Sequence, residues 1–240
     1  MKIPTISLVI PAYNEEKYIG ECLRHALNQS GGSFFEIIVI DNASTDKTAE
    51  VAKKFTSVRV AREEMKGLTR ARQRGLLEAR GDVLAYADAD TRMPPNWCET
   101  IVREFSADEK LACLSGPYLY YDVGRWKKIL VWLYWHILAL PVYGVVGYMT
   151  VGGNFAVRRG VLEKMNGFDT SIEFYGEDTN IARRAHRLGR VKFSLRFVMP
   201  TSGRRLAGQG LARTGILYVS NFISEVLFKK PVTKKYNDIR

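Results

Sequence analysis

The sequence predicts one α/β domain over residues 1–240, built on a doubly wound, mainly parallel sheet with helices on both faces. A chain of 240 residues suffices for one substantial core and is too short for two large domains. Short apolar runs alternate with segments of helical periodicity through residues 1–116, which is the pattern of consecutive strand–helix–strand units. The apolar run 83–90 ends in Asp88 and Asp90, at the carboxyl end of a predicted strand, where ligands of such sheets bind.

The individual elements follow from apolar spacing, from Pro and Gly breaks and from capping residues. The predicted strands cover residues 5–10, 36–40, 58–61, 83–90, 111–115 and 191–197. The predicted helices cover residues 15–29, 68–79, 96–105, 160–165 and the amphipathic segment 215–228, with two more that begin at Ser44 and at Glu177. Asn14 is expected to cap the first helix, and Asp46 to complement the dipole of the second.

Charge and cysteine content narrow the possible partners and compartment. The chain carries 36 Lys and Arg against 25 Asp and Glu, a net charge of +11. This charge favours anionic partners, such as nucleic acid, phospholipid or a phosphorylated substrate. Three scattered cysteines are too few for a disulfide framework or a zinc cluster, and residues 1–10 lack the pattern of a signal peptide. We therefore expect a cytoplasmic protein.

Polar groups follow three of the predicted strands. They are the segment Pro-Ala-Tyr-Asn-Glu at 11–15, the segment Asp-Asn-Ala-Ser-Thr-Asp at 41–46, and the pair Asp88 and Asp90. Residues two apart on extended chain point the same way, so the two aspartates could share one hard cation such as Mg²⁺ or Mn²⁺. An acidic pair alone also fits a turn or a helix cap. In a parallel sheet, however, all three groups meet at one edge, which outlines a nucleoside diphosphate site.

Five motifs in order carry a resemblance to a known family. They read PAYNEE, VIDNASTD, ARGDVLAYADAD, GGNFAVRR and GEDTNIARRAHRLG, within about residues 6–205. With these motifs the chain resembles the family 2 glycosyltransferases of the GT-A fold, a Rossmann-like architecture. The resemblance implies a nucleotide-diphosphate-sugar donor, a bound Mn²⁺ or Mg²⁺ and an acceptor that is a glycan or is linked to a lipid.

The resemblance also assigns the donor site residue by residue. It implies that Pro11, Tyr13 and Glu15 line the nucleotide, that Asp41 lies at the base, and that Asp88 lies near the ribose or the metal. Asp90 is then the principal metal ligand of a DxD motif. A turn that ends the strand is the alternative for Pro11 and Tyr13, and a helix-capping turn with Ser44 is the alternative for Asp41. Gly153, Asn154 and Arg204 are the remaining residues expected to bind the donor.

The loop Gly152-Gly153-Asn154 is expected to approach the transferred sugar closely, since glycines let backbone amides come near a ligand. A strand entry with a bulge is the alternative. Residues 174–178, Phe-Tyr-Gly-Glu-Asp, match the acidic motif that supplies the base in inverting members of the family. Asp178 is the predicted base and Glu177 the alternative. Both could instead be acids that stabilise a helix N-terminus.

Two departures from the family pattern limit what the resemblance implies. Many relatives place a metal-binding histidine after the next strand, whereas residues 200–205 read Pro-Thr-Ser-Gly-Arg-Arg. A third protein ligand is therefore in doubt, and Arg204 and Arg205 could offer forked donors to phosphate instead. The segment 209–213 resembles the QxxRW element of processive synthases but lacks the tryptophan, so we expect no processivity.

The uncharged block 129–149 is long enough to span a bilayer, which takes about 20 residues. A single crossing would put Asp88 and Asp178 on opposite sides of the membrane, although both must meet one sugar. The remaining possibilities are a re-entrant hairpin bent at Pro141, an interfacial helix, a lid over the acceptor, and a buried hairpin or subunit contact. Basic residues on either side suit an anionic lipid surface: Lys127, Lys128, Lys229, Lys230, Lys234 and Lys235.

The sequence therefore predicts a metal-dependent, inverting glycosyltransferase at the inner face of the cell membrane, active in cell-envelope glycan or glycolipid synthesis. Four parts are expected: a nucleotide-sugar-binding half at 1–116, an apolar insertion at 117–150, a catalytic half at 151–205 and a helix with a basic tail at 206–240. A sugar nucleotidyltransferase is the nearest alternative, but a phosphate loop rich in Gly and Arg is absent near the N-terminus. A basic nucleic-acid-binding module is the other, but no recognition motif accompanies the charge, and we expect no nucleic acid partner.

Overall fold

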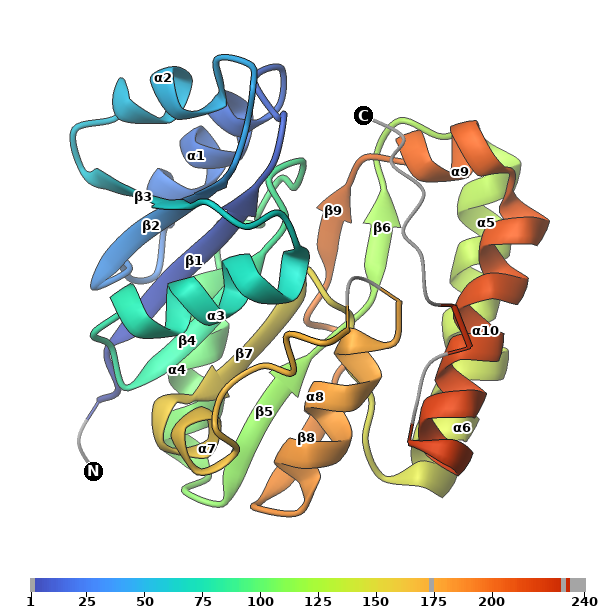
Figure 1. Ribbon diagram of the computed structural model, residues 1–240. Coiled ribbons are helices and arrows are strands. Elements are labelled where there is room, and N and C mark those ends of the chain that lie inside the picture. The colour runs from blue at the N-terminus through green and yellow to red at the C-terminus, as the bar shows by residue number, and fades with distance from the viewer. Residues whose placement is uncertain (1–2, 173–174, 230–231, 234–240) are drawn as a thin grey trace.

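A computed structural model describes residues 3–172, 175–229 and 232–233 (Figure 1). The strands are β1 (Ile6–Ala12), β2 (Glu36–Asn42), β3 (Val58–Glu63), β4 (Val83–Ala87), β5 (Leu111–Ser115), β6 (Tyr118–Tyr120), β7 (Asn154–Arg158), β8 (Arg190–Phe193) and β9 (Met199–Thr201). The helices are α1 (Ile19–Leu27), α2 (Thr48–Lys53), α3 (Leu68–Glu78), α4 (Trp97–Ala107), α5 (Arg125–Leu133), the π-helical η1 (Tyr134–Ala139), α6 (Leu140–Val146), α7 (Arg159–Lys164), α8 (Glu177–His186), α9 (Arg204–Gln209) and α10 (Leu211–Phe228).

The central sheet has the order β3-β2-β1-β4-β7-β5-β8, and β7 runs antiparallel to both of its neighbours. The strands β1, β2, β4, β5 and β7 are largely buried on both faces, and alternate residues enter two separate cores. In β1, Leu8 and Ile10 pack with α1 and α4, whereas Val9 packs with the core that includes α3, α7 and α8. This arrangement confirms the predicted mainly parallel sheet with helices on both faces.

The loops after β1 and β2 differ from the sequence prediction. Asn14 is not a helix cap, because it adopts a left-handed conformation (φ 52°) and its Oδ1 accepts from the backbone N–H of Thr45 at 2.9 Å. Helix α1 consequently begins only at Ile19. Asp46 accepts from the backbone N–H of Thr48 at 2.9 Å, so it stabilises the first turn of α2 as expected.

A second, two-stranded sheet of β6 and β9 was not predicted. Its strands run parallel, with Tyr118 opposite Met199 and Tyr120 opposite Thr201. The predicted strand 191–197 accordingly ends at Phe193, and the chain re-enters a sheet at Met199. This small sheet carries the chain from β5 to the apolar block and places Thr201 beside the end of β4, where Thr201 bridges to Thr91.

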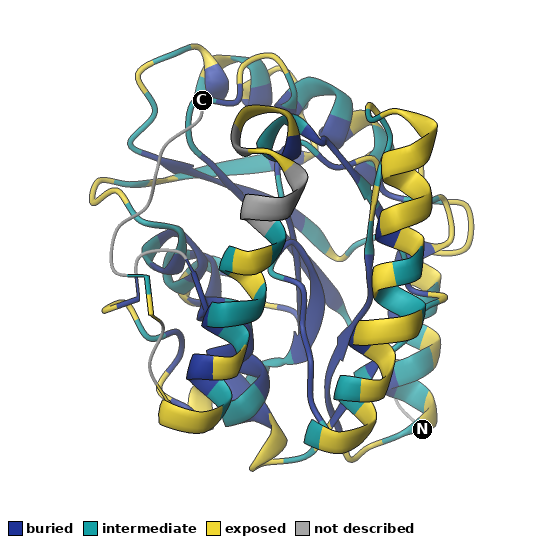
Figure 2. Ribbon diagram, turned by 90° about the vertical axis from the view of Figure 1, so that its right-hand side faces the viewer, coloured by how far each residue is buried: buried dark blue, intermediate teal, exposed yellow. Residues whose placement is uncertain are grey.

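The apolar block forms one long helix that runs through α5, η1 and α6 without a break at Pro141. A hairpin bent at Pro141 is therefore excluded. The π-helical turn comes directly before this proline, which takes a position in the first turn of α6, where its missing N–H is tolerated. The inner side of the helix packs through Val131, Trp135 and Ala139, whereas its outer side is largely exposed, as Figure 2 shows in yellow.

Helix α10 and this long helix flank the same end of the sheet (Figure 1), and α10 packs on α8. Its position is held by Glu225, which is fully buried and accepts from Arg183 Nη2 at 2.8 Å and from Asn180 Nδ2 at 3.0 Å. Both partners belong to α8. Arg183 thereby supplies the counter-ion that a buried carboxylate requires.

Candidate active site

The three predicted strand ends converge as expected, because β2, β1 and β4 are adjacent and parallel. Beyond them lies a cavity of about 540 Å³ that reaches from the sheet to the long helix and α10. Its polar end is lined by Pro11, Glu15, Arg72, Asp88, Asp90, Gly153, Glu177, Asp178, Thr201 and Arg204. Its apolar end is lined by residues that include Leu130, Tyr134, Leu138, Val142, Tyr218 and Phe222.

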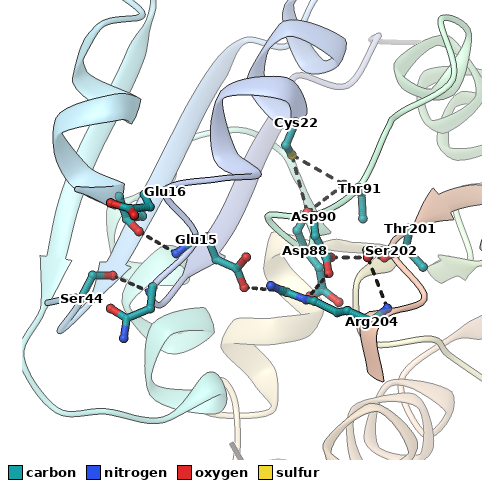
Figure 3. Close-up of polar contacts among 12 residues, drawn as sticks. Glu15, Glu16, Cys22, Ser44, Asp88, Asp90, Thr91, Thr201, Ser202 and Arg204 are labelled. Atoms are coloured by element: carbon teal, nitrogen blue, oxygen red, sulfur yellow. Dashed lines mark hydrogen bonds and ion pairs between the residues drawn. The ribbon is translucent and has the colours of Figure 1, made fainter. Parts of the chain in front are cut away.

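Asp90 lies at the polar end and has both carboxylate oxygens engaged (Figure 3). Its Oδ2 is 3.0 Å from Arg204 Nε, and its Oδ1 accepts from Thr201 Oγ1 at 3.2 Å. Arg204 reaches further, and its Nη2 donates to Oε1 of the buried Glu15 at 2.5 Å. Burial raises the pKa of Asp90 to about 6, although the positive charge of Arg204 opposes this shift.

Asp88 lies next to Asp90 and receives a hydrogen bond from the Tyr118 hydroxyl, 2.6 Å from Oδ2. Gly153 lies directly against this pair. A Cβ at this position would come within 2.0 Å of the Tyr118 hydroxyl oxygen and 2.3 Å of Asp88 Cγ. Only glycine therefore fits here. The backbone of Gly153 lies close to the Asp88 carboxylate, so the loop makes the close approach that its glycines permit.

Glu177 and Asp178 open α8 and both line the cavity, but their surroundings differ. Glu177 is buried and bound by the guanidinium of Arg72, which also donates to the Gly152 carbonyl at 2.5 Å. Burial raises the pKa of Glu177 to about 7 despite this partner. Asp178 is half-buried, and its Oδ1 accepts from the backbone N–H of Thr179 at 2.8 Å. Burial raises the pKa of Asp178 above its ordinary value.

Three predicted donor-site residues do not line the cavity. Asn154 is fully buried, and its amide bonds Trp97 Nε1 at 3.0 Å and the Phe197 carbonyl at 2.7 Å, so it anchors the loop from within the core. Asp41 accepts from Arg62 Nη1 at 2.8 Å and from the Ser44 backbone N–H at 3.2 Å. The second contact closes a turn with Ser44, but it caps no helix, because α2 begins only at Thr48. The Tyr13 ring is half-buried, with Lys66 Nζ 3.9 Å from its centroid. Phe174 of the acidic motif and the tail residues Lys230, Lys234 and Lys235 lie outside the described residues.

Sequence reasoning missed Arg72, Tyr118 and Thr201. Arg72 had a readable signal, because it falls between Thr69 and Leu76 on the inner face of α3, where a buried cation requires an acidic partner. The sequence around Tyr118 and Thr201 contains no comparable signal, since both residues reach the site only through the small sheet of β6 and β9.

The carboxylates present suit a divalent cation that a diphosphate helps to bind. Among the residues that the structure describes, no cluster of three or more His, Cys, Asp and Glu side chains with metal-site geometry is found. Asp88 and Asp90 nevertheless supply oxygen ligands at one cavity wall, and Mg²⁺ or Mn²⁺ typically takes one or two carboxylates together with substrate phosphates and water. The predicted pair therefore fits such an ion.

Comparisons with known proteins agree with this geometry. Residues 7–165 match the model of the family described as glycosyl transferase family 2. A dolichol-phosphate mannosyltransferase of Pyrococcus furiosus is 30% identical over 172 residues, which cover 66% of this chain and 47% of that protein. The chain also spans less than half the length of several other curated relatives.

Two solved structures share the fold over most of the chain. The mannosyltransferase PcManGT of Pyrobaculum calidifontis, solved with GDP-Man and Mn²⁺, aligns with a TM-score of 0.71 at 20% identity, over 95% of this chain and 64% of that one. Glucosyl-3-phosphoglycerate synthase of Mycobacterium tuberculosis, solved with Mn²⁺, UDP and phosphoglyceric acid, aligns with a TM-score of 0.64 at 20% identity, over 94% and 78%. The fold is therefore GT-A, and the chain belongs to glycosyl transferase family 2.

Proposed function

We propose that the protein transfers a sugar from a nucleoside-diphosphate sugar to an acceptor hydroxyl or phosphate, with inversion at the anomeric carbon. One observation carries the proposal: a single cavity has the Asp88 and Asp90 carboxylates at one wall and Asp178 at another. Family membership and the two neighbours solved with nucleotides and Mn²⁺ support it.

The roles of the residues follow from their positions. Asp88 and Asp90 would hold Mn²⁺ or Mg²⁺, which supplies positive charge for the leaving diphosphate. Asp178 accepts the proton of the acceptor hydroxyl. The acceptor oxygen then bonds to the anomeric carbon as the bond from this carbon to the diphosphate oxygen breaks. Glu177 is the less suitable base, because its carboxylate is held by Arg72.

A thermal-shift panel of nucleotide sugars, with Mn²⁺ and with chelator, tests the donor class. A ligand that binds only the folded state at 100 times its dissociation constant stabilises it by about 2.7 kcal/mol. We expect one nucleoside-diphosphate sugar to give the largest rise in melting temperature, and only with the metal. A response to a nucleoside triphosphate with a sugar phosphate would favour the nucleotidyltransferase instead. Tight DNA binding with a steep dependence on salt would favour the nucleic-acid module.

We further propose that the long helix rests on an anionic membrane surface and that the acceptor is lipid-linked. The segment Arg125–Val146 has the length and apolar character of a membrane-crossing helix, with a mean hydropathy of 1.8 and only 11% of its most apolar window buried. Trp126 is 80% exposed, Ile137 68% and Val145 89%. The apolar end of the cavity opens between this helix and α10. The mannosyltransferase relative, named for dolichol phosphate, supports a lipid-linked acceptor.

Liposome flotation measures this association. The protein should float with vesicles that contain anionic lipid at low salt, and binding should fall as salt shortens the Debye length from about 30 Å at 0.01 M to 10 Å at 0.1 M. Replacing Trp126 and Ile137 by Ser should weaken flotation, whereas the same change at Leu77, an exposed residue of α3, should not. If the protein is monodisperse without detergent and does not bind anionic vesicles, the exposed side of the long helix is a subunit contact instead.

A further inference from the structure

Arg204 lies between two carboxylates of the cavity, the buried Glu15 and the half-buried Asp90. It is the first residue of α9, and its side chain extends from Asp90 to Glu15 across the end of β4 (Figure 3). Nε lies 3.0 Å from Asp90 Oδ2, and Nη2 lies 2.5 Å from Glu15 Oε1. The guanidinium also stacks over Tyr18, 4.7 Å from the ring centroid. The single guanidinium of Arg204 thus pairs with the carboxylates of both Asp90 and Glu15.

This contact conflicts with metal binding at the same carboxylate. Asp90 Oδ1 already accepts a hydrogen bond from Thr201, and Oδ2 is paired with Arg204. A divalent cation that binds Asp90 Oδ2 would lie against the positively charged guanidinium in a partly dehydrated site, where charges of the same sign repel strongly. Metal and guanidinium are therefore alternative partners of this oxygen.

We propose that Arg204 competes with the metal for Asp90 and moves from this carboxylate to the donor diphosphate when metal and donor bind together. The inference rests on the proposed function for the identity of the ligand. The guanidinium has five donors in a planar fork, which suits both the carboxylates that it leaves and the phosphate oxygens that it meets. The exchange makes metal alone bind weakly and makes metal and diphosphate favour each other, which is a positive coupling between two ligands.

The test measures Mn²⁺ binding to the whole protein by calorimetry or electron paramagnetic resonance, without nucleotide. Arg204→Gln should bind Mn²⁺ about tenfold more tightly than the wild type, a ratio that corresponds to about 1.4 kcal/mol. Arg205→Gln removes the same charge one residue away, from a side chain whose guanidinium contacts the Tyr175 hydroxyl at 3.5 Å, and should leave Mn²⁺ affinity unchanged. Asp90→Asn in the Arg204→Gln background should abolish the gain.

Inorganic pyrophosphate then serves as the diphosphate probe. It should raise Mn²⁺ affinity strongly in the wild type and less in Arg204→Gln, and the variant should bind pyrophosphate more weakly at saturating Mn²⁺. Exchange therefore predicts that Arg204→Gln binds Mn²⁺ alone more tightly than the wild type but binds pyrophosphate more weakly. If Arg204→Gln binds Mn²⁺ no more tightly than the wild type, Arg204 does not compete with the metal and the inference fails.

A substitute variant and a comparison with transfer activity show whether a negative result comes from misfolding, from the proposed function or from the role of Arg204. If Arg204→Gln does not fold, Arg204→Lys is measured in its place, because it keeps the charge without the fork and should give the same signs with smaller changes. The binding assays involve no transfer. A protein that shows this coupling and transfers no sugar would contradict the proposed function alone, whereas a transferase without the coupling would contradict the role of Arg204 alone.

Discussion

Asp90→Asn should reduce sugar transfer by about 10³-fold or more, because it removes the anionic oxygen that would bind the metal beside the leaving diphosphate. The fold should remain intact. Asparagine has nearly the same volume and keeps an acceptor for Thr201, and Arg204 keeps Glu15 as its partner. Transfer rates at saturating donor, Mn²⁺ affinity and thermal melting measure the three expectations.

The stability of this variant has a predictable sign. Burial raises the pKa of Asp90 to about 6, above the value of about 3.9 in an unfolded chain. A carboxyl group with a raised pKa in the folded state destabilises that state increasingly as pH rises from about 4 through 6. Asp90→Asn should therefore not lower the melting temperature at pH 7. Glu163→Gln, an exposed change on α7, is the control for activity. A fully active Asp90→Asn, or full activity in excess chelator, would refute the metal assignment.

Asp178→Asn should lower kcat by about 10²–10⁴-fold, the usual contribution of a general base, while the KM for the donor changes little. In the proposed mechanism the base acts on the acceptor hydroxyl, and the donor diphosphate is held by other residues of the cavity. Only the ionised form of Asp178 can accept the proton, and its raised pKa shifts the loss of activity on acidification to higher pH than for an ordinary aspartate. This acidic limb of the pH profile should vanish in the variant.

Glu177→Gln is the informative comparison, because the two acids are adjacent but differ in their partners. Glu177→Gln removes the charge that pairs with Arg72, but burial raises the pKa of Glu177 to about 7 and so already opposes this charge at neutral pH. Arg72 also keeps Asp88 Oδ1 at 3.8 Å and the Gly152 carbonyl as partners. We therefore expect both variants to fold and to melt close to the wild type at pH 7. An active Asp178→Asn with a folded but inactive Glu177→Gln would assign the base to Glu177. Retention of the donor configuration in the product would contradict a single in-line attack.

The chemistry of the acceptor determines how much rate Asp178→Asn loses. An acceptor phosphate is already ionised and needs no base, so Asp178→Asn would then lose only a modest part of its rate. The same variant thus distinguishes a hydroxyl acceptor from a phosphate acceptor.

The sequence predicted the sheet and the convergence of its strand ends because strand periodicity and parallel topology are local and general properties. Glu15, Asp88 and Asp90 reach the cavity for this reason, whereas Asp178 lines it from the first turn of α8. The sequence did not predict the observed contacts of Asn14 and Asn154. A polar residue beside a glycine or before a helix can bind a ligand, stabilise a turn or hydrogen-bond within the core, and the local sequence does not distinguish these roles. Only the fold shows that Asn154 bonds Trp97 and Phe197. Thr201 could not be predicted either, since β9 has three residues and no distinctive pattern.

The π-helical turn at Tyr134–Ala139 determines which side chains of the long helix face the cavity. Upstream of the turn's end, Trp135 Nε1 donates to the Tyr118 carbonyl at 3.1 Å, and downstream the Tyr143 hydroxyl donates to the Val191 carbonyl at 3.0 Å. An α-helix turns by about 100° per residue, so one residue fewer in this segment would rotate everything after it by that angle. Tyr143 and Val142 would then point away from the sheet. Two chains of equal hydropathy that differ by one residue here would differ in helical phase, and hence in the shape of the apolar end of the cavity.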